Sequence, residues 1–396
     1  MKRVVVTGVG VITSIGEGAE NFWDACLNGQ SGISEIKKEG LQLVGPKFGG
    51  QTHHFNPSNY VQKILVNHIG RGAQLLIASI RHAFEHAKLK KEEYGEADLF
   101  VGTTMGEVIG EYTHSLYTNN QKADQSLLEL NKLNNILVYA CKEFGLYGSA
   151  MLISNACAAG NYATIQAYEK IRNGNSKIAI AAGTDPFSSV AYYGFNRLNA
   201  ISPDKCRPFD KNRKGMLVAE GSGCLILEEY QSARQRNAPI LAEMNGYGVS
   251  ADAFHITSPH PEAKGIISST LKCLHNSDIS PIDVDYISAH GTGTNANDKA
   301  ESMAIQKIFG ESTPVSSIKS MLGHSMGAAS AIESVACCLA IRDQIVPPTI
   351  NFENKDDNCR IDCVPNTARE LNVNKALNNS YAFGGTNASV LFKKAE

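Results

Sequence analysis

The sequence predicts an α/β fold with largely parallel sheets. Short apolar runs that end in glycine or polar turns alternate with longer segments whose apolar residues recur at helical spacing. Strands separated by helices in this way are typical of parallel sheets with helices on their faces. We predict strands at residues 4–6, 97–101, 150–154, 178–182, 286–289 and 314–318, and helices at 71–88, 126–144, 158–173, 298–309 and 327–342.

The order of these elements occurs twice, which predicts two related halves. In the first half, the strand at 150–154 leads through Cys157 into a helix rich in alanine and glycine. In the second half, the strand at 314–318 leads through His324 into a similar helix. Only the element order and the small-residue content recur. The polar segment 234–237 resembles a linker, so we expect halves at residues 1–237 and 238–396.

The composition is that of a globular protein and argues against several classes. Of the residues, 43% are hydrophobic and 19% are charged, and the net charge is −2, which gives no strong field for nucleic acid or membrane surfaces. No apolar run reaches the length of a membrane span, and Gly8 interrupts the run near the N-terminus. The ten cysteines have no regular spacing, which is typical of a reduced compartment. We therefore expect a cytoplasmic protein without nucleic-acid or membrane partners.

Cys157 is the leading candidate for a nucleophile. It follows a predicted strand and opens a helix of very small residues. The positive end of a helix dipole and its unpaired N–H groups favour the thiolate, which is the reactive form of cysteine. The small neighbours leave room for a substrate to approach the sulfur. Taken alone, the segment is also compatible with a buried structural cysteine.

Two histidine motifs follow in the second half. His290 ends a predicted strand and precedes Thr292 and Thr294, whose hydroxyls could bind the amides of a ligand. Taken alone, this segment is also compatible with a turn that carries a partly exposed histidine. His324 lies across a turn from Lys319, and Glu301 is a candidate partner for that lysine if it is buried. The alternative for this second motif is a surface lysine with a capping histidine.

Together, the motifs place one cysteine and two histidines at equivalent strand ends, where α/β folds build their sites. A metal site is the first competing interpretation, but Cys157, His290 and His324 include no local pair of ligands to nucleate one. A cysteine–histidine hydrolase is the second, and it leaves one histidine motif unexplained. We therefore expect cysteine-based catalysis without a metal or cofactor.

The chain resembles the β-ketoacyl-[acyl carrier protein] synthase family, of the elongating type with one cysteine and two histidines. The resemblance runs nearly from end to end and implies a thiolase-like fold with two halves in five α-β-α-β-α layers. It rests on Val6-Thr7-Gly8-Val9-Gly10, the Cys157 turn, Arg207-Pro208-Phe209-Asp210, Ala219-Glu220-Gly221, His290 to Thr294 with Asp298 and Glu301, Lys319 with Gly323-His324, and Phe383-Gly384-Gly385-Thr386-Asn387.

The resemblance implies an acyltransferase, a 3-oxoacyl-[acyl carrier protein] synthase. Cys157 would accept an acyl chain, and His290 and His324 would serve decarboxylation of a malonyl thioester. Lys319 and Glu301 would support them. The partners implied are an acyl carrier protein and a second copy in a homodimer, and the product would belong to fatty acid or specialised polyene or polyketide synthesis.

Binding roles follow from the same resemblance. Thr292 and Thr294 would contact the phosphopantetheine arm, Phe383 would gate the acyl pocket, and Met105 would line it. The backbone N–H groups of Cys157 and Phe383 would hold an oxyanion. Two alternatives remain: a non-catalytic chain-length partner subunit, which usually lacks the nucleophile, and a thiolase, which needs a second reactive cysteine.

One departure from the family pattern concerns the carrier protein. The segment from Tyr60 to Arg71 resembles a helix that is often strongly basic in relatives, yet here only Lys63 and Arg71 are basic. We expect either more apolar docking of a specialised carrier protein or docking at the basic block 205–214.

Overall fold

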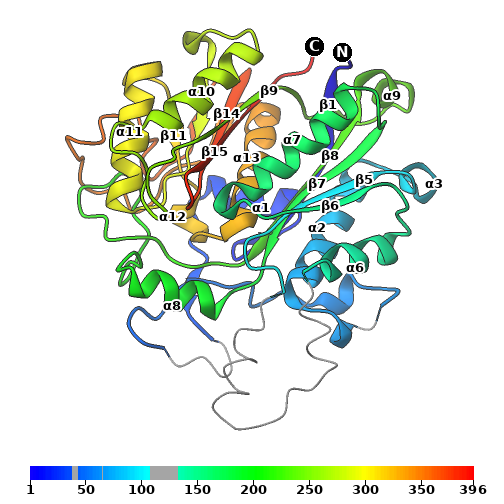
Figure 1. Ribbon diagram of the computed structural model, residues 1–396, viewed down its shortest axis with the longest axis horizontal. Helices are drawn as coiled ribbons and strands as arrows, with labels where there is room; N and C mark the ends of the chain where they lie inside the picture. Colours follow the sequence, from blue (N-terminus) through cyan, green and yellow to red (C-terminus); the bar gives the residue numbers. More distant parts are fainter. Residues whose placement is uncertain (38–42, 65, 108–132) are drawn as a thin grey trace.

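The computed structural model describes residues 1–37, 43–64, 66–107 and 133–396 (Figure 1). The strands of the first half lie in the order β6-β5-β7-β8-β1. Strands β6, β5 and β7 are mutually parallel, whereas β8 runs antiparallel to both β7 and β1. These strands are β1 (Val4–Thr13), β5 (Asp98–Gly102), β6 (Ala150–Ile153), β7 (Ile178–Asp185) and β8 (Gly221–Glu229).

The second half repeats this arrangement in the order β11-β10-β14-β15-β9. Its first three strands are parallel, and β15 is antiparallel to both β14 and β9. The two sets join where Val4–Val6 of β1 pairs with 242–244 of β9. The strands are β9 (Ala242–Ala251), β10 (Tyr286–Ser288), β11 (Val315–Ser316), β14 (Lys375–Tyr381) and β15 (Thr386–Lys393).

The prediction of largely parallel sheets is wrong. Along the strand order, four neighbouring pairs are parallel, and five are antiparallel. Most of the antiparallel strands are buried on both faces, as β1 is along its whole length. Such strands are apolar throughout whether they run parallel or antiparallel, so their composition does not reveal their direction.

Helices complete five layers. Helices α7 (Ala159–Arg172) and α13 (Ala329–Asp343) pack against each other between the two sets of strands. Helices α2 (Arg71–His86) and α6 (Asn135–Phe144) cover the outer face of the first half, and α10 (Lys264–Asn276) and α11 (Asn295–Phe309) cover that of the second. Helix α13 is buried at every residue from 329 to 341, as expected for a central helix that is apolar on all sides.

The remaining elements are short and connect the layers. The predicted helix 126–144 corresponds to α6 in its second part, and its first part lies outside the described residues. No helix in the described ranges is both long and apolar enough to cross a membrane. The short elements are β2 (Gly16–Glu17), α1 (Ala19–Leu27), β3 (Ile33–Glu35), β4 (Phe48–Gly50), η1 (Pro57–Asn59), η2 (Val66–His68), α3 (Lys91–Tyr94), η3 (Ala156–Ala158), α8 (Ser189–Arg197), α9 (Tyr230–Gln235), η4 (Pro281–Asp283), α12 (Lys319–Leu322), η5 (Met326–Ala328), β12 (Ile345–Val346) and β13 (Arg369–Glu370).

Candidate active site

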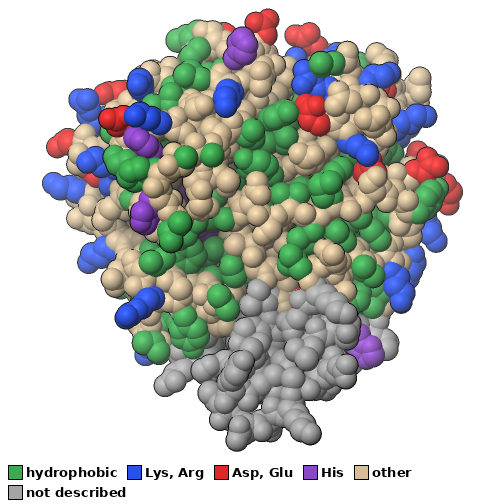
Figure 2. All heavy atoms as spheres, in the orientation of Figure 1, with side chains coloured by type: hydrophobic (Ala, Val, Ile, Leu, Met, Phe, Trp, Pro, Cys, Tyr) green, Lys and Arg blue, Asp and Glu red, His purple; other side chains and the backbone are tan. Residues whose placement is uncertain are grey.

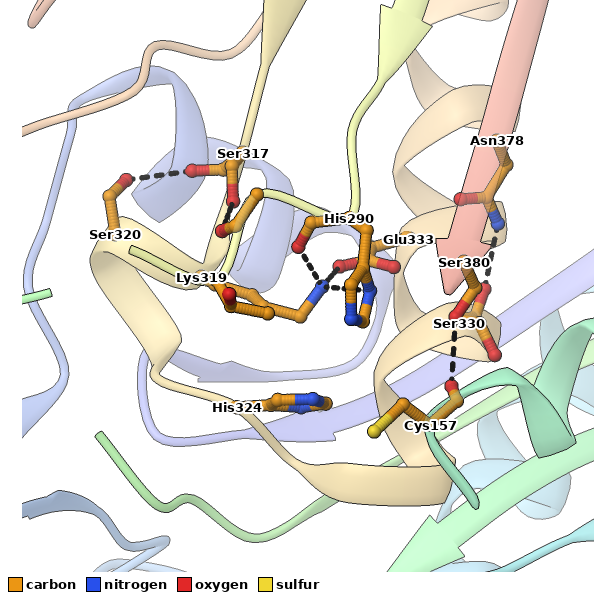
Figure 3. Close-up of polar contacts among 12 residues, drawn as sticks. Cys157, His290, Ser317, Lys319, Ser320, His324, Ser330, Glu333, Asn378 and Ser380 are labelled. Carbon is orange, nitrogen blue, oxygen red and sulfur yellow. Dashed lines mark hydrogen bonds and ion pairs between the residues drawn. The ribbon is translucent and has the colours of Figure 1, made fainter. Parts of the chain in front are cut away.

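Three predicted site residues meet where the halves face each other. Cys157 follows β6, His290 follows β10, and His324 follows β11. One sulfur or ring nitrogen from each lies within 4.8 Å of the others, and all three residues are buried. Figure 3 shows the two imidazole rings and the thiol converging from different elements. The nucleophile candidate therefore comes from one half and both histidines come from the other.

Cys157 lies in a tight turn at the start of α7. The preceding residue, Ala156, has a φ of +45°, a left-handed conformation that is uncommon for a residue other than glycine. The carbonyl of Cys157 accepts a hydrogen bond of 2.9 Å from the Ser380 hydroxyl (Figure 3). The strained turn and this hydrogen bond fix the backbone of the cysteine against β14.

Burial raises the pKa of the Cys157 thiol to about 11. The positive charge of Lys319 and the backbone N–H groups of Phe383 and Cys157 lower the pKa but do not offset burial. The sequence led us to expect a stabilised thiolate, and here the effect of burial exceeds that of the helix start. A pKa this high favours the protonated thiol at neutral pH.

His324 precedes an equivalent turn at the start of α13. Met326 has a φ of +50°, and its backbone N–H donates to Nδ1 of His324 over 3.2 Å. An Nδ1 that accepts leaves the ring proton on Nε2. Burial, and then the charge of Lys319, hold the pKa of His324 well below its ordinary value. His324 is therefore a neutral N–H donor.

His290 is fixed through its backbone. Its N–H donates to Glu301 over 2.8 Å, and its carbonyl accepts from Nζ of Lys319 over 2.7 Å. The same Nζ lies 3.5 Å from Nδ1 of His290, so Nδ1 is the acceptor and Nε2 carries the proton. Burial, followed by the charges of Lys319 and His324, lowers the pKa of His290 well below its ordinary value. Both histidines thus present N–H groups without charge.

The partner of Lys319 differs from the predicted one. Lys319 forms a buried ion pair with Glu333 on α13, and Glu301 instead accepts the backbone N–H groups of His290 and Gly291, each over 2.8 Å. Burial raises the pKa of Glu333 to about 7 and that of Glu301 to about 8. The sequence did carry a signal for Glu333, since it is an acidic residue inside an otherwise apolar and small-residue helix.

A cleft of about 610 Å³, lined by both polar and apolar residues, leads from the surface to the three side chains. Thr292 and Thr294 line it, with their hydroxyl oxygens 2.9 Å apart, and so do both histidines and Cys157. The predicted hydroxyl pair therefore lies along the path by which a long polar arm would reach the sulfur.

A second cavity of about 630 Å³ adjoins Cys157 and is almost entirely apolar. Met105 lies in its wall as predicted, together with Met326. Both cavities include Cys157 and Phe383 in their lining, so the sulfur lies where the surface cleft meets the apolar cavity. In Figure 2, hydrophobic side chains gather on this face around α8. The exposed ones on or next to α8 include Val190, Tyr193 and Leu198.

Phe383 lies in the turn between β14 and β15, at the boundary of the two cavities. Its ring is 38% exposed and packs on Phe195 with the ring centroids 5.2 Å apart. Gly384 and Gly385 follow with φ values of +83° and +76°, which favour glycine. A partly exposed aromatic ring on a glycine turn is suited to moving between open and closed positions.

The same three side chains are of the types that can bind a metal ion. Among the described residues they are a cysteine–histidine group whose ligand atoms lie within 4.8 Å of one another. Zinc needs its nitrogen and sulfur ligands about 2.0–2.3 Å from one point, which requires a closer approach. The buried ammonium of Lys319 contacts His290 and opposes a cation there. The arrangement is better suited to binding a negative oxygen.

Comparisons with known proteins agree with this geometry. The chain matches the family model described as Beta-ketoacyl synthase, N-terminal domain over residues 1–233, and the model described as Beta-ketoacyl synthase, C-terminal domain over residues 241–353. It is 36% identical to 3-oxoacyl-[acyl-carrier-protein] synthase 2 of a Synechocystis species, over 99% of this chain and 98% of the relative. It is also 36% identical to Nodulation protein E of Rhizobium meliloti, over 99% of both chains.

Solved structures show the same similarity over the full chain. The ishigamide ketosynthase/chain length factor superposes with a TM-score of 0.96 at 36% identity, covering 100% of both chains. A type II PKS acyl-carrier protein in complex with its ketosynthase superposes with a TM-score of 0.90 at 31% identity, again over 100% of both chains. From its thiolase-like layers, its cysteine–histidine–histidine cluster and these matches, we conclude that this chain belongs to the β-ketoacyl synthase family.

Proposed function

We propose that this protein is a 3-oxoacyl-[acyl carrier protein] synthase, an acyltransferase that elongates an acyl chain by decarboxylative condensation. The observation that carries the proposal is a buried cysteine that faces two neutral histidine N–H donors where a surface cleft and an apolar cavity meet. The relatives named as 3-oxoacyl-[acyl-carrier-protein] synthases support the substrate class.

The first step loads the enzyme. The sulfur of Cys157 attacks an acyl thioester, the acyl–sulfur bond to the carrier breaks, and the cysteine proton ends on the departing pantetheine sulfur. The N–H groups of Cys157 and Phe383, which point at the sulfur, would hold the oxyanion of the tetrahedral intermediate. The apolar cavity then holds the hydrocarbon chain.

The second step generates the carbon nucleophile. A malonyl thioester enters through the cleft and loses CO2, so that the electron pair of the broken bond becomes an enolate with its charge on the thioester oxygen. Neutral N–H donors from His290 and His324 stabilise that charge, each by about 3 kcal/mol by analogy with oxyanion holes. Because both rings are neutral, they stabilise the enolate without protonating its carbon.

The third step forms the carbon–carbon bond. The enolate carbon attacks the acyl group on Cys157, and the resulting intermediate collapses by breaking the acyl–sulfur bond. The 3-oxoacyl chain leaves on the carrier protein, and the cysteine takes up a proton. Lys319 positions His290 through its carbonyl, and Glu301 holds the backbone of the same residue. We propose these two as positioning groups, with Glu333 fixing Lys319.

The cavities suggest how substrates are recognised. Thr292 and Thr294 are proposed to bind the amides of the pantetheine arm, because their hydroxyls line the cleft that leads to the sulfur. Met105 is proposed to limit the length of the acyl chain, because it lies in the wall of the apolar cavity. Phe383 is proposed as a gate, because it borders both cavities.

The two alternative functions explain the site less well. A non-catalytic chain-length partner subunit would not require a cysteine beside the N–H donors of two histidines. A thiolase needs a second reactive cysteine, yet Cys359 and Cys363 are buried in a separate apolar cluster of the second half. The condensing reaction is the one that uses Cys157, His290 and His324 together.

A carrier protein is the proposed partner, as in the solved ketosynthase complex. The Arg71 guanidinium is paired with Glu220 over 3.0 Å and bonded to Thr52, so it serves the fold. In the basic block, by contrast, Lys205, Lys211 and Lys214 are exposed. Gly215 next to this block donates to Gly293 beside the cleft. We therefore favour docking of the acidic carrier at the block 205–214.

We also propose a homodimer of chains that each comprise halves 1–237 and 238–396. The repeated strand order supports the two halves. In support of the dimer, β6 ends the described sheet, and its outer residues include Met151, which is 49% exposed. An exposed apolar edge strand favours pairing with another chain. The ten cysteines, all of them in described residues, are unpaired, which supports a cytoplasmic location.

The experiment that tests the proposal is mass spectrometry of the intact protein after incubation with a panel of acyl-carrier thioesters, followed by peptide mapping. We expect an acyl adduct on Cys157 that is lost in Cys157→Ala. The matched control is Cys141→Ala, which removes the one cysteine that is not fully buried and should retain the adduct. Cys157→Ala should still decarboxylate malonyl-carrier protein. An adduct on another residue, or none with any donor, would favour the partner-subunit function.

A further inference from the structure

A buried carboxylate at the end of β7 lies beside the site and has no part in the chemistry described above. Asp185 is fully buried. One of its oxygens accepts from the Thr103 hydroxyl over 2.5 Å and from the backbone N–H of Met105 over 2.7 Å, and both oxygens accept from the N–H of Thr104 over 3.0–3.1 Å. The turn that carries Thr104 and Met105 into the acyl cavity is therefore wrapped around one side chain.

The other carboxylate oxygen reaches across to the second half. It accepts from the backbone N–H of Gly327, in η5, over 2.6 Å. A Cβ at Gly327 would stand 2.9 Å from Asp185 and 2.8 Å from the nitrogen of Thr104, closer than such contacts allow. Gly327 occupies the position in its turn that Cys157 occupies in the equivalent turn of the first half. The second half thus has a glycine there that lets η5 approach the carboxylate.

The element η5 lies just after His324 in the chain. Its first residue, Met326, donates its N–H to Nδ1 of His324 over 3.2 Å, and this bond leaves the ring proton on Nε2. The side chain of Met326 also lines the acyl cavity. One carboxylate therefore holds both the wall of the acyl cavity and the short element that orients His324.

We infer that Asp185 is a positioning residue that couples the acyl cavity to His324. An acyl chain that displaces Met105 or Met326 moves elements bonded to this one carboxylate, so the shape of the bound chain is transmitted to the N–H donor used in decarboxylation. The inference rests on the proposed function.

The negative charge of Asp185 is unfavourable for the nearby Cys157, so its presence there needs a structural reason. Its negative charge acts to raise the pKa of Cys157 and so works against the nucleophile. Burial raises the pKa of Asp185 itself to about 6, while its four donors lower it. Every one of these donors needs an acceptor, and an ionised carboxylate supplies acceptors alone. Its benefit is therefore the fixed arrangement of the turn 103–105 and η5.

The test compares Asp185→Asn with Asp98→Asn. Asp98 is a buried carboxylate at the far end of neighbouring β5, where it accepts from Ser149 over 2.7 Å. For each protein we would measure malonyl-carrier decarboxylation per folded molecule, and competition between long and short acyl donors for Cys157. Asp185→Asn places an NH2 group against N–H donors, so we expect decarboxylation to fall about 10- to 100-fold and the ratio of acyl donors to change. Asp98→Asn should alter neither.

Two further variants keep the carboxylate and loosen one side at a time. Thr103→Val removes a bond on the acyl side, so its larger effect should be on acyl preference. Gly327→Ala displaces η5, so its larger effect should be on decarboxylation. If Asp185→Asn fails to fold, these two variants test the inference in its place. Equal effects of each variant on both readouts, or an Asp185→Asn protein with unchanged decarboxylation and preference, would overturn the inference. An inactive wild-type protein would instead overturn the proposed function.

Discussion

Replacing His290 with alanine should separate decarboxylation from acyl loading. In the proposed mechanism, loading relies on the backbone N–H groups of Cys157 and Phe383, whereas the malonyl enolate relies on the two histidine rings. Loss of one of two donors removes about 3 kcal/mol of stabilisation, or about 10²-fold in rate. The ammonium of Lys319 keeps Glu333 and the backbone carbonyl at position 290 as partners, so no buried charge is stranded. The variant should therefore fold.

The assay follows two products from the same protein sample by mass spectrometry. Acetyl-carrier protein formed from malonyl-carrier protein reports decarboxylation, and the adduct on Cys157 reports loading. We expect the first to fall about 10²-fold and the second to change by less than about threefold. The control is His82→Ala, a histidine on α2 that contacts Tyr60 outside both cavities. Equal losses in the two products, or unchanged decarboxylation, would refute the assignment of His290.

Three other outcomes follow from the site. Because burial raises the pKa of Cys157 to about 11, its alkylation by iodoacetamide should rise about tenfold per pH unit from pH 7 to 9; a plateau near pH 7 would contradict this. Met105→Trp should fill the apolar cavity and shift products toward shorter chains, and an unchanged product distribution by mass spectrometry would place Met105 outside the acyl path. The pKa of Glu301, raised by burial to about 8, exceeds that of an unfolded glutamate, about 4.3. Its contribution to stability should therefore fall as pH rises from about 5 to about 8. Urea denaturation of Glu301→Gln should show a weaker pH dependence than wild type, and equal slopes would count against this ionisation.

The sequence motifs were sufficient to select the three side chains that meet in the structure. His290 and His324 follow neighbouring parallel strands, and the carboxyl ends of such strands share one edge. Cys157 follows a strand of the other parallel group, so its contact with the histidines depends on how the two halves pack. The overall arrangement of two halves was predictable, since it depends on the order of elements.

Features that depend on tertiary packing were beyond the sequence. Lys319 pairs with Glu333 because α13 passes between the sheets, and Asp185 meets Gly327 because η5 lies against β7. The pKa of Cys157 depends on how deeply the turn is buried, which local residue types do not reveal. Arg71 likewise pairs with Glu220, a partner far away in the sequence.

Because the site residues are divided between the two halves, a break in the chain between the halves would separate them. The polypeptide passes from one half to the other between the end of β8 and the start of β9, through α9. A break there would leave the first fragment with Cys157 but without the two histidines proposed to stabilise the enolate. The second fragment would hold both histidines but would lack Cys157, the proposed acyl acceptor. Neither fragment alone could carry out the proposed condensation. Recovery of condensation on mixing the two fragments would then report directly on their ability to recognise each other along the shared helical layer.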